Sequence, residues 1–371
     1  MNPGTLRKSV LAAALFVFAC GAGGGRGRAR PLENDAGPAG AGKKPISLGM
    51  IGLDTSHVIA FTRRINDPEH PTGCRVTAAY PGGSPDVKAS AGRVAGFTRR
   101  MAEEFGVTMV GSIEALLARV DGVLLMSVDG RTHLAQARPV IAAGKALFID
   151  KPFAAGLAEG MEIFRLAAEA GVPCWSASAL RFCPGVTGLR HDERVGRVLG
   201  VDAYSPCHLE PHHPDLYWYG IHGVEILFTL MGPGCRTVQR THTPDGDVVT
   251  GVWKDGRIGT FRGLRAGKLD YGALVFGAEG IARTGPFTGY DGLVEEIVKF
   301  FKTGKAPVAP EETLEILAFM TAADRSKERQ GAPVALDEVF REAGKGAPPP
   351  RPREPPGPRE RRRSESDRPG M

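Results

Sequence analysis

Residues 143–152 read AGKALFIDKP, and this stretch decides the fold of the chain. The apolar run LFI within it is typical of a short strand buried on both faces, as in a parallel sheet. Pro152 cannot continue the strand's hydrogen bonds, so the strand is predicted to end before it. Asp150 and Lys151 would then lie at the carboxyl end of a buried strand, which is where open α/β sheets bind ligands. Lys151 either has a pKa tuned for proton transfer there or only caps the strand and pairs with Asp150.

Strands and helices alternate around this stretch. Buried-strand patterns recur at residues 46–52, 74–80, 121–128 and 172–178, and helical patterns lie between them. This alternation predicts a doubly wound, Rossmann-type parallel sheet over residues 45–180.

Beyond Arg181 the pattern changes to several strands joined by short turns, with three longer helices. Asp255-Gly256 is a hairpin signal. Residues 181–343 are therefore predicted to form a C-terminal α+β domain with an open, largely antiparallel sheet, so the fold class is α/β followed by α+β.

The two ends of the 371-residue chain differ from its middle. Residues 1–44 combine a leader-like segment at 1–20, with Arg7 and Lys8 before an apolar run, and a low-complexity linker; the alternatives are an exported or lipoprotein-like chain and an over-long start of a cytoplasmic one. Residues 344–371 are a Pro/Arg-rich tail predicted to be disordered. Both ends are basic, whereas the middle is mildly acidic, so the net charge of +6 does not argue for nucleic-acid binding. No integral membrane span is expected.

The turn after the first strand is only partly a phosphate-binding turn. Gly52 stands at the first position of a G-x-G-x-x-G fingerprint, but Asp54 and His57 occupy the second and third glycine positions. A carboxylate there repels phosphate unless it turns away or caps the helix, whereas His57 could offer phosphate a donor at the helix N-terminus. Ser84 with Lys88 or Arg93 would suit a 2′-phosphate.

A second polar cluster spans residues 207–225 and holds four of the nine histidines. On a helix, His222 and Glu225 share a face, and the aromatic residues 217–219 can stack on a sugar or a nicotinamide. Three interpretations remain open: a metal site built from His212 or His213 with His222 and Glu225, histidines bonded to backbone beneath a loop, or a catalytic His222. The spacing matches no common metal motif, and no metal is predicted.

Two motifs together resemble the Gfo/Idh/MocA oxidoreductase family, which includes glucose–fructose oxidoreductase and inositol dehydrogenase. The sequence AGK followed by Asp150-Lys151-Pro152 is similar to the family's A-G-K…E-K-P signature, and residues 220–225 (GIHGVE) resemble its D-x-G-x-H-x-x-D helix. The resemblance covers about residues 46 to 340. His133 stands where the family has a histidine in the loop after the fourth strand.

The resemblance implies an NAD(P)-dependent oxidoreductase acting on a sugar or cyclitol. The exposed face of the open sheet in the second domain is expected to pair with another subunit, so a homo-oligomer is predicted. The implied catalytic residues are Lys151, His222 and Glu225. The implied cofactor-binding residues are Gly52, Asp54, Thr55, Ser56, His57, Tyr80, Ser127, Asp129, His133, Asp150 and Lys151. The implied substrate-binding residues are Arg181, His212, His213, Tyr217, Trp218 and Tyr219.

The sequence departs from the family where acid–base chemistry is expected. Trp218 stands at the first catalytic aspartate of the family, and Glu225 and Asp150 replace another aspartate and a glutamate. Two other functions therefore stay open: a non-redox sugar-binding or sugar-processing relative, and a metal-assisted lyase or isomerase that uses the histidine cluster.

Overall fold

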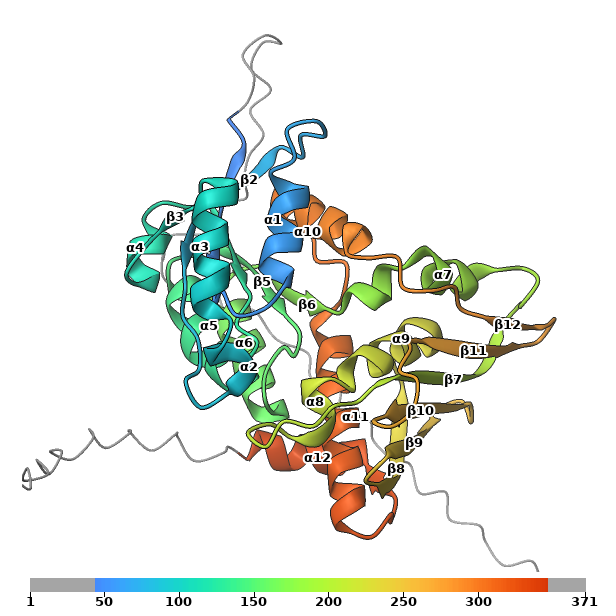
Figure 1. Ribbon diagram of the computed structural model, residues 1–371. Coiled ribbons are helices and arrows are strands. Elements are labelled where there is room, and N and C mark those ends of the chain that lie inside the picture. The colour runs from blue at the N-terminus through green and yellow to red at the C-terminus, as the bar shows by residue number, and fades with distance from the viewer. Residues whose placement is uncertain (1–43, 346–371) are drawn as a thin grey trace, which may run out of the picture.

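The computed structural model describes residues 44–345, which form two sheets with helices packed around them (Figure 1). The expected leader, linker and tail lie outside these residues, except where they border them, and stay predictions. The first sheet has six strands, all paired in parallel, in the order β3-β2-β1-β4-β5-β6. The predicted doubly wound sheet is confirmed. Its strands are β1 (Ile46–Ile51), β2 (Cys74–Tyr80), β3 (Thr108–Met109), β4 (Gly122–Leu125), β5 (Ala146–Asp150) and β6 (Cys174–Ala177).

Helices cover both faces of this sheet because its central strands are buried on both sides; Leu147, Phe148 and Ile149 of β5 are all fully buried. One core layer joins the sheet to helices that include α1 and α10, and the other joins it to helices that include α5 and α6. The helices that follow the strands of the first sheet are α1 (His57–Ile65), α2 (Lys88–Ala91), α3 (Val94–Phe105), α4 (Ile113–Leu117), α5 (His133–Ala142) and α6 (Leu157–Ala170).

The second sheet has seven strands in the order β12-β11-β7-β10-β9-β8-β13. Every pair in it is antiparallel except β7 with β10, and Asp255-Gly256 forms the predicted turn between β9 and β10. The predicted α+β architecture is confirmed. The strands are β7 (Val198–Pro206), β8 (Cys235–Thr243), β9 (Gly246–Trp253), β10 (Ile258–Leu264), β11 (Gly272–Gly277), β12 (Ile281–Arg283) and β13 (Val334–Ala335).

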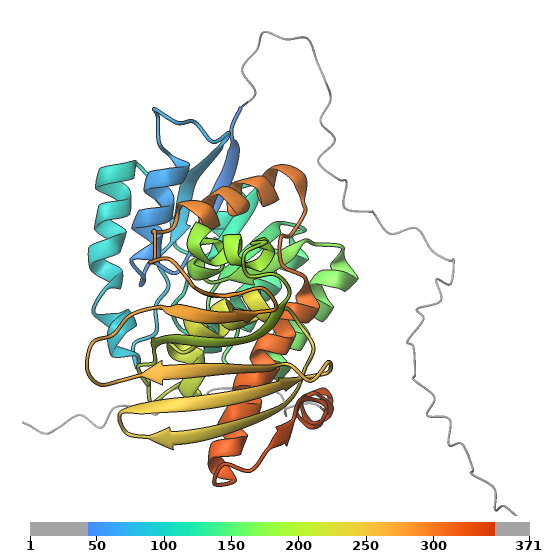
Figure 2. The same cartoon turned by 90° about the vertical axis from the view of Figure 1, so that its right-hand side faces the viewer.

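Only one face of the second sheet is covered. The fully buried helix α9 and the long helix α11 pack behind it, and the opposite face is open toward the viewer in Figure 2. Exposed apolar side chains occur on these strands, with Ile258 53% and Ile281 66% exposed. The remaining helices are α7 (Pro184–Thr187), α8 (Asp215–Trp218), α9 (Ile221–Met231), α10 (Asp291–Thr303), α11 (Pro310–Glu328) and α12 (Leu336–Gly344), with short 3-10 turns at Gly130–Thr132, Ala179–Phe182 and Gly188–His191.

The helix α10 crosses from one half of the chain to the other. It follows the second sheet in sequence but packs beside α1 on the first sheet, where Leu293 and Phe300 join the core of Leu48 and Phe61 (Figure 1). Amphipathicity explains this position, because one stripe of α10 is apolar and buried while its other side carries charge. Within residues 44–345, no helix is both long and apolar enough to cross a bilayer.

Candidate active site

A cavity of about 460 Å³ lies at the carboxyl edge of the first sheet, where the two halves of the chain meet. Lys151, directly after β5, lines it together with the start of α1 and with residues from the second half. This volume is within the range of small-molecule sites. The lining residues are Thr55, Ser56, His57, Ala89, Arg93, Val128, Lys151, Ser178, Ala179, Leu180, His208, Trp218, Tyr219, His222, Tyr271, Phe287 and Tyr290.

Aromatic and imidazole rings form an almost continuous wall around this cavity, which we call the aromatic collar: His57, Tyr290, Phe287, Tyr271, His222 and Tyr219. Successive ring centroids along this series lie 4.8, 5.6, 6.1, 5.8 and 5.1 Å apart. Lys151 closes the series, since its Nζ lies 5.6 Å from the centre of the Tyr219 ring. A ring of flat apolar faces with polar edges suits a molecule that has both C–H faces and hydroxyl groups.

His57 and Asp150 form a buried pair in this wall. His57 Nδ1 lies 2.6 Å from Asp150 Oδ2, and the other carboxylate oxygen accepts a hydrogen bond from the Lys151 amide. Burial alone would raise the pKa of Asp150, but the neighbouring His57 and Lys151 outweigh it and hold the pKa below its usual value. Asp150 is therefore an anion that orients the His57 ring.

His222 projects from the first turn of α9 and is fixed by Ser178, whose hydroxyl lies 2.7 Å from His222 Nδ1. Burial, the charge of Lys151 and the nearby His57 together hold the pKa of His222 well below its usual value. The imidazole is thus neutral near pH 7, with its Nδ1 engaged.

This buried neutral histidine gives a pH dependence to stability. The unfolded chain binds a proton near pH 6.5, whereas folded His222 does not, so the free energy of unfolding should fall as pH drops below about 6.5, by up to about 1.4 kcal/mol per pH unit for each such histidine. His133 is also fully buried with a lowered pKa and adds to the effect. In urea unfolding between pH 5.5 and 8, His222→Asn should remove about half of this slope. The same change at the exposed His191 is the control, and an unchanged slope in His222→Asn would contradict a neutral buried imidazole.

The awkward carboxylate in the first turn faces away from the cavity. Asp54 is fully buried, and it accepts hydrogen bonds from the Ser90 hydroxyl (2.7 Å) and the Val128 amide (2.9 Å). Burial raises the pKa of Asp54, and the Ser90 hydrogen bond only partly offsets it. In contrast, the backbone N–H groups of Thr55 and Ser56 make no hydrogen bond to the described residues, and both residues line the cavity at the start of α1. This turn can therefore receive a phosphate despite its missing glycines.

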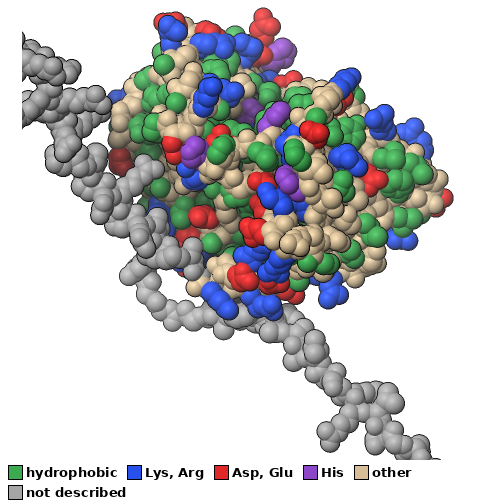
Figure 3. Space-filling view, turned by 60° about the horizontal axis from the view of Figure 1, so that its bottom comes forward, with side chains coloured by type: hydrophobic (Ala, Val, Ile, Leu, Met, Phe, Trp, Pro, Cys, Tyr) green, Lys and Arg blue, Asp and Glu red, His purple; other side chains and the backbone are tan. Residues whose placement is uncertain are grey.

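A polar bridge joins the loops after β2 and β4. The Ser84 hydroxyl donates to Asp129 (2.6 Å), Arg131 pairs with Asp129 (2.7 Å), and His213 Nε2 lies 3.1 Å from the same carboxylate. Burial would raise the pKa of Asp129, but these three contacts hold it below its usual value. Figure 3 shows histidine side chains gathered with charged ones on the lower face of the molecule. Ser84 and Asp129 are thus occupied within the protein.

Several residues predicted for the site lie elsewhere. Arg181 is buried in ion pairs with Glu225 (2.6 Å) and Glu312 (2.6 Å), so Glu225 does not face the cavity. His212 pairs with Glu210 at the surface, and the Tyr217 hydroxyl donates to the Leu317 carbonyl in the core. The remaining predicted residues that do not line the cavity are Gly52, Asp54, Tyr80, Ser127, Asp129, His133, Asp150 and His213.

Two of these residues, Gly52 and His133, have a structural role. Gly52 has φ +87°, and a Cβ there would lie 2.5 Å from the backbone of Ser127, so only glycine fits. His133 bridges the carbonyls of Ser127 (2.7 Å) and Phe153 (3.2 Å), which ties the loop after β4 to the loop after β5. Both residues shape the sheet edge without reaching the cavity.

Several residues that line the cavity were not predicted from the sequence, among them Ser178, His208, Tyr271, Phe287 and Tyr290. The last two lie in the segment GPFTGY (residues 285–290), where two aromatic residues stand in a Gly/Pro-rich loop without any strand or helix pattern. Aromatic residues in such a loop, of which Phe287 is 40% exposed, were the available signal.

Across residues 44–345, no group of three or more His, Cys, Asp or Glu side chains is arranged to hold a metal ion. Three of the four histidines of the 207–225 cluster have separate polar partners: Glu210 for His212, Asp129 for His213 and Ser178 for His222. The fourth, His208, lies against the ring of Tyr219 (5.3 Å). The interpretation of this cluster as one metal site therefore finds no support in its geometry.

The fold and the cavity define a two-part nucleotide-binding α/β protein with its ligand site at the carboxyl edge of the first sheet. Residues 48–178 match the model of the oxidoreductase family with an NAD-binding Rossmann fold, GFO_IDH_MocA. This match covers the first sheet and its helices, and it supports placing that domain among the NAD-binding oxidoreductases of the Gfo/Idh/MocA family. No curated protein matches the chain.

Solved structures share the whole architecture at low sequence identity. Scyllo-inositol dehydrogenase from Lactobacillus casei, with bound NAD(H) and scyllo-inositol, is 14% identical with a TM-score of 0.67, covering 79% of this chain and 100% of that one. Myo-inositol 2-dehydrogenase from Lactobacillus plantarum is 15% identical (TM-score 0.66, 79% and 99% covered). A probable dehydrogenase from Thermotoga maritima is 20% identical (0.65, 79% and 100%). At these identities the likeness establishes the fold.

The residues of this chain fit a nicotinamide dinucleotide. The cavity is lined by Ala89 and Arg93 after β2, by Thr55 and Ser56 after β1 and by Lys151 after β5, and the loops at this edge of the sheet are where such folds hold a dinucleotide. The backbone N–H groups of Thr55 and Ser56 can donate to a cofactor phosphate. The Asp54 carboxylate points into the protein, so it does not repel that phosphate. When bound, the cofactor supplies hydride transfer, and the protein supplies binding and orientation.

Proposed function

We propose that this protein interconverts a hydroxyl and a carbonyl group on a sugar or cyclitol, with Lys151 and His222 at the reacting carbon. The observation that supports this most is the aromatic collar, which puts Lys151, His222 and three tyrosines around one cavity. Aromatic faces bind the C–H faces of a carbohydrate, and the polar edges bind its hydroxyl groups. Two of the structural neighbours are inositol dehydrogenases, and inositols belong to this class of substrate.

In this proposal Lys151 hydrogen-bonds the reacting oxygen and stabilises its developing negative charge. Neutral His222 donates or accepts at a second hydroxyl through Nε2, because Ser178 occupies Nδ1. Arg93, at the far end of the cavity, would contact a cofactor phosphate. In this proposal the residues at this end of the cavity determine whether NAD or NADP binds.

Cofactor binding is the direct test. Titration of the full chain with NADH and with NADPH, followed by cofactor fluorescence, should give saturable binding of at least one. A panel of polyols that includes myo-inositol and scyllo-inositol should then produce or consume nicotinamide absorbance. A chain that binds a polyol but neither cofactor would instead favour a non-redox, sugar-binding function.

We also propose that two copies of the chain associate through the open face of the second sheet. Apolar residues on or beside its strands, among them Leu199, Val252 and Leu274, remain exposed on the isolated chain. Light scattering of the purified protein should give an oligomer mass, and Ile258→Lys should lower it. A monomer at micromolar concentration would contradict this association.

A further inference from the structure

The proposed oxidation releases a proton from the substrate hydroxyl, and the family residue expected to help is missing because Trp218 replaces it. Five residues that line the cavity carry a side-chain nitrogen that can hold a proton: Lys151, His222, His57, His208 and Arg93. The guanidinium of Arg93 is no proton acceptor, and the exposed His208 has no carboxylate or hydroxyl partner among the described residues to orient it. His222 is poorly suited to accept a proton, since burial and the positive charge of Lys151 hold its pKa well below the usual value. A protonated Lys151 has no lone pair to offer.

His57 has the arrangement of an oriented base. Asp150 lies 2.6 Å from Nδ1, which fixes the tautomer that carries the proton on Nδ1 and stabilises the imidazolium once it forms. Nε2 makes no hydrogen bond to the described residues, and His57 lines the cavity. Its ring stacks on Phe61 (5.4 Å, 14°) and lies against Tyr290 (4.8 Å), so its orientation is fixed by packing.

We propose that His57, oriented by Asp150, is the group that accepts the proton of the substrate hydroxyl. This inference rests on the proposed oxidoreductase function. The O–H bond breaks and its proton goes to Nε2, its electron pair forms the second C–O bond, and hydride leaves the carbon for an oxidised nicotinamide dinucleotide. His57 then returns the proton to solvent, because its side chain is still about 10% exposed.

In this proposal the acid–base residue, His57, lies in the turn after β1, whereas the family resemblance implied one in the second domain. His57 occupies the third glycine position of the fingerprint, where a side chain would otherwise be excluded. The groups that face it come from several elements: Asp150 at the end of β5, Lys151 after it, His222 on α9, and Tyr290 before α10.

The test uses the full chain, with NAD⁺ and myo-inositol (or whichever polyol of the panel turns over) for turnover, and NADH for cofactor binding. His57→Gln should lower kcat/KM by about 10²- to 10³-fold while NADH binding changes by less than about threefold. Asp150→Asn should also lower kcat, since it removes the group that orients His57. The control is His70→Gln, because His70 pairs with Asp67 in the same way on the surface (3.1 Å); it should leave turnover unchanged.

A readout that does not depend on turnover completes the test. In ¹⁵N-histidine NMR spectra at pH 8, His57 should be the tautomer with its proton on Nδ1, and Asp150→Asn should disturb this tautomer. A proton on Nε2 at pH 8, or turnover retained in His57→Gln, overturns the assignment to His57. Loss of NADH binding in His57→Gln also overturns it and makes His57 a phosphate contact. Absence of any turnover and cofactor binding in the wild-type chain overturns the proposed function itself.

Discussion

Replacing Lys151 by methionine is expected to lower kcat by about 10³-fold while the chain keeps its fold. Methionine retains an apolar stem of similar length, and Lys151 is only 8% exposed, so the packing beside Tyr219 is preserved. What is lost is the ammonium group at the reacting oxygen. The loss should appear in kcat more than in the affinity for NADH, because the charge acts on the transition state.

A second consequence separates a catalytic lysine from a structural one. The charge of Lys151 depresses the pKa of His222, so Lys151→Met should raise that pKa, which ¹⁵N NMR measures directly. The matched control is Lys145→Met, which changes the lysine that precedes β5 at the opposite edge of the sheet. Turnover within about threefold of wild type in Lys151→Met would show that Lys151 only caps the strand.

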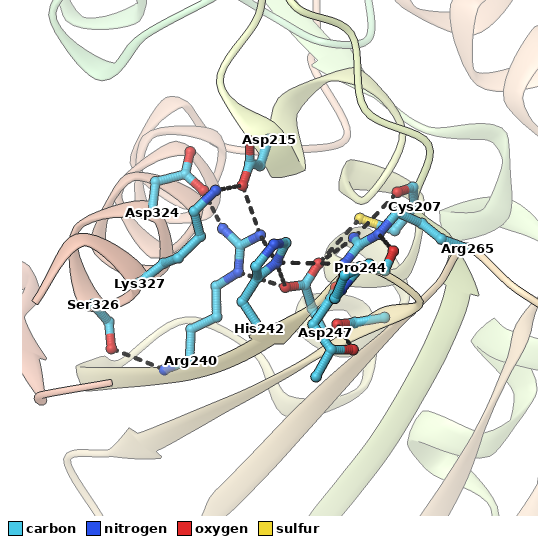
Figure 4. Close-up of polar contacts among 12 residues, drawn as sticks. Cys207, Asp215, Arg240, His242, Pro244, Asp247, Arg265, Asp324, Ser326 and Lys327 are labelled. Atoms are coloured by element: carbon cyan, nitrogen blue, oxygen red, sulfur yellow. Dashed lines mark hydrogen bonds and ion pairs between the residues drawn. The ribbon is translucent and has the colours of Figure 1, made fainter. Parts of the chain in front are cut away.

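Replacing Arg240 by methionine is expected to lower the free energy of unfolding by about 3–5 kcal/mol. Arg240 lies on β8, is buried, and pairs with Asp215 (2.8 Å), Asp247 (2.8 Å) and Asp324 (2.5 Å) (Figure 4). Without the guanidinium, Asp247 keeps only part of its compensation, from Arg265 and His242. The loss of stability arises because buried carboxylates are left without enough compensating positive charge. It does not measure how much the ion pairs themselves stabilise the fold.

The measurement is urea unfolding at pH 7.5, with the exposed Arg236 on the same strand replaced by methionine as the control. Burial raises the pKa of Asp324 to about 7. The variant should therefore be less destabilised at pH 6, where Asp324 can take up a proton. Equal stability of Arg240→Met and wild type would show that the network contributes nothing to folding.

Because Asp215 begins α8, which carries Trp218, the variant should also weaken polyol binding.

The sequence predicted the fold well because its signals are local. The LFI run before Asp150-Lys151-Pro152 identifies a parallel strand and its end, and Ser112 caps α4 as its residue type predicts, accepting from the Ala115 amide. The position of α10 was not predictable in this way, because its amphipathic stripe indicates burial without naming the surface that buries it.

The site was predicted in part. Four predicted residues line the cavity: Lys151, His222, Trp218 and Tyr219. Lys151 was predicted from its motif at the end of a strand, and the other three from the polar cluster near the start of a helix. Glu225 and Arg181 do not, because two oppositely charged buried side chains satisfied each other 2.6 Å apart, and no local pattern reveals a partner 44 residues away. The same reason hid the pairing of His57 with Asp150, which are 93 residues apart.

The packing of α10 on the first sheet also bears on how the chain is made. During synthesis, residues 45–180 leave the ribosome long before Leu293 and Phe300, which cover one face of that sheet. Until then, apolar side chains of Leu48, Phe61 and Trp175 lack part of their cover. The nucleotide-binding half therefore cannot complete its folding cotranslationally as an independent unit, and a fragment ending near residue 180 should be prone to aggregate.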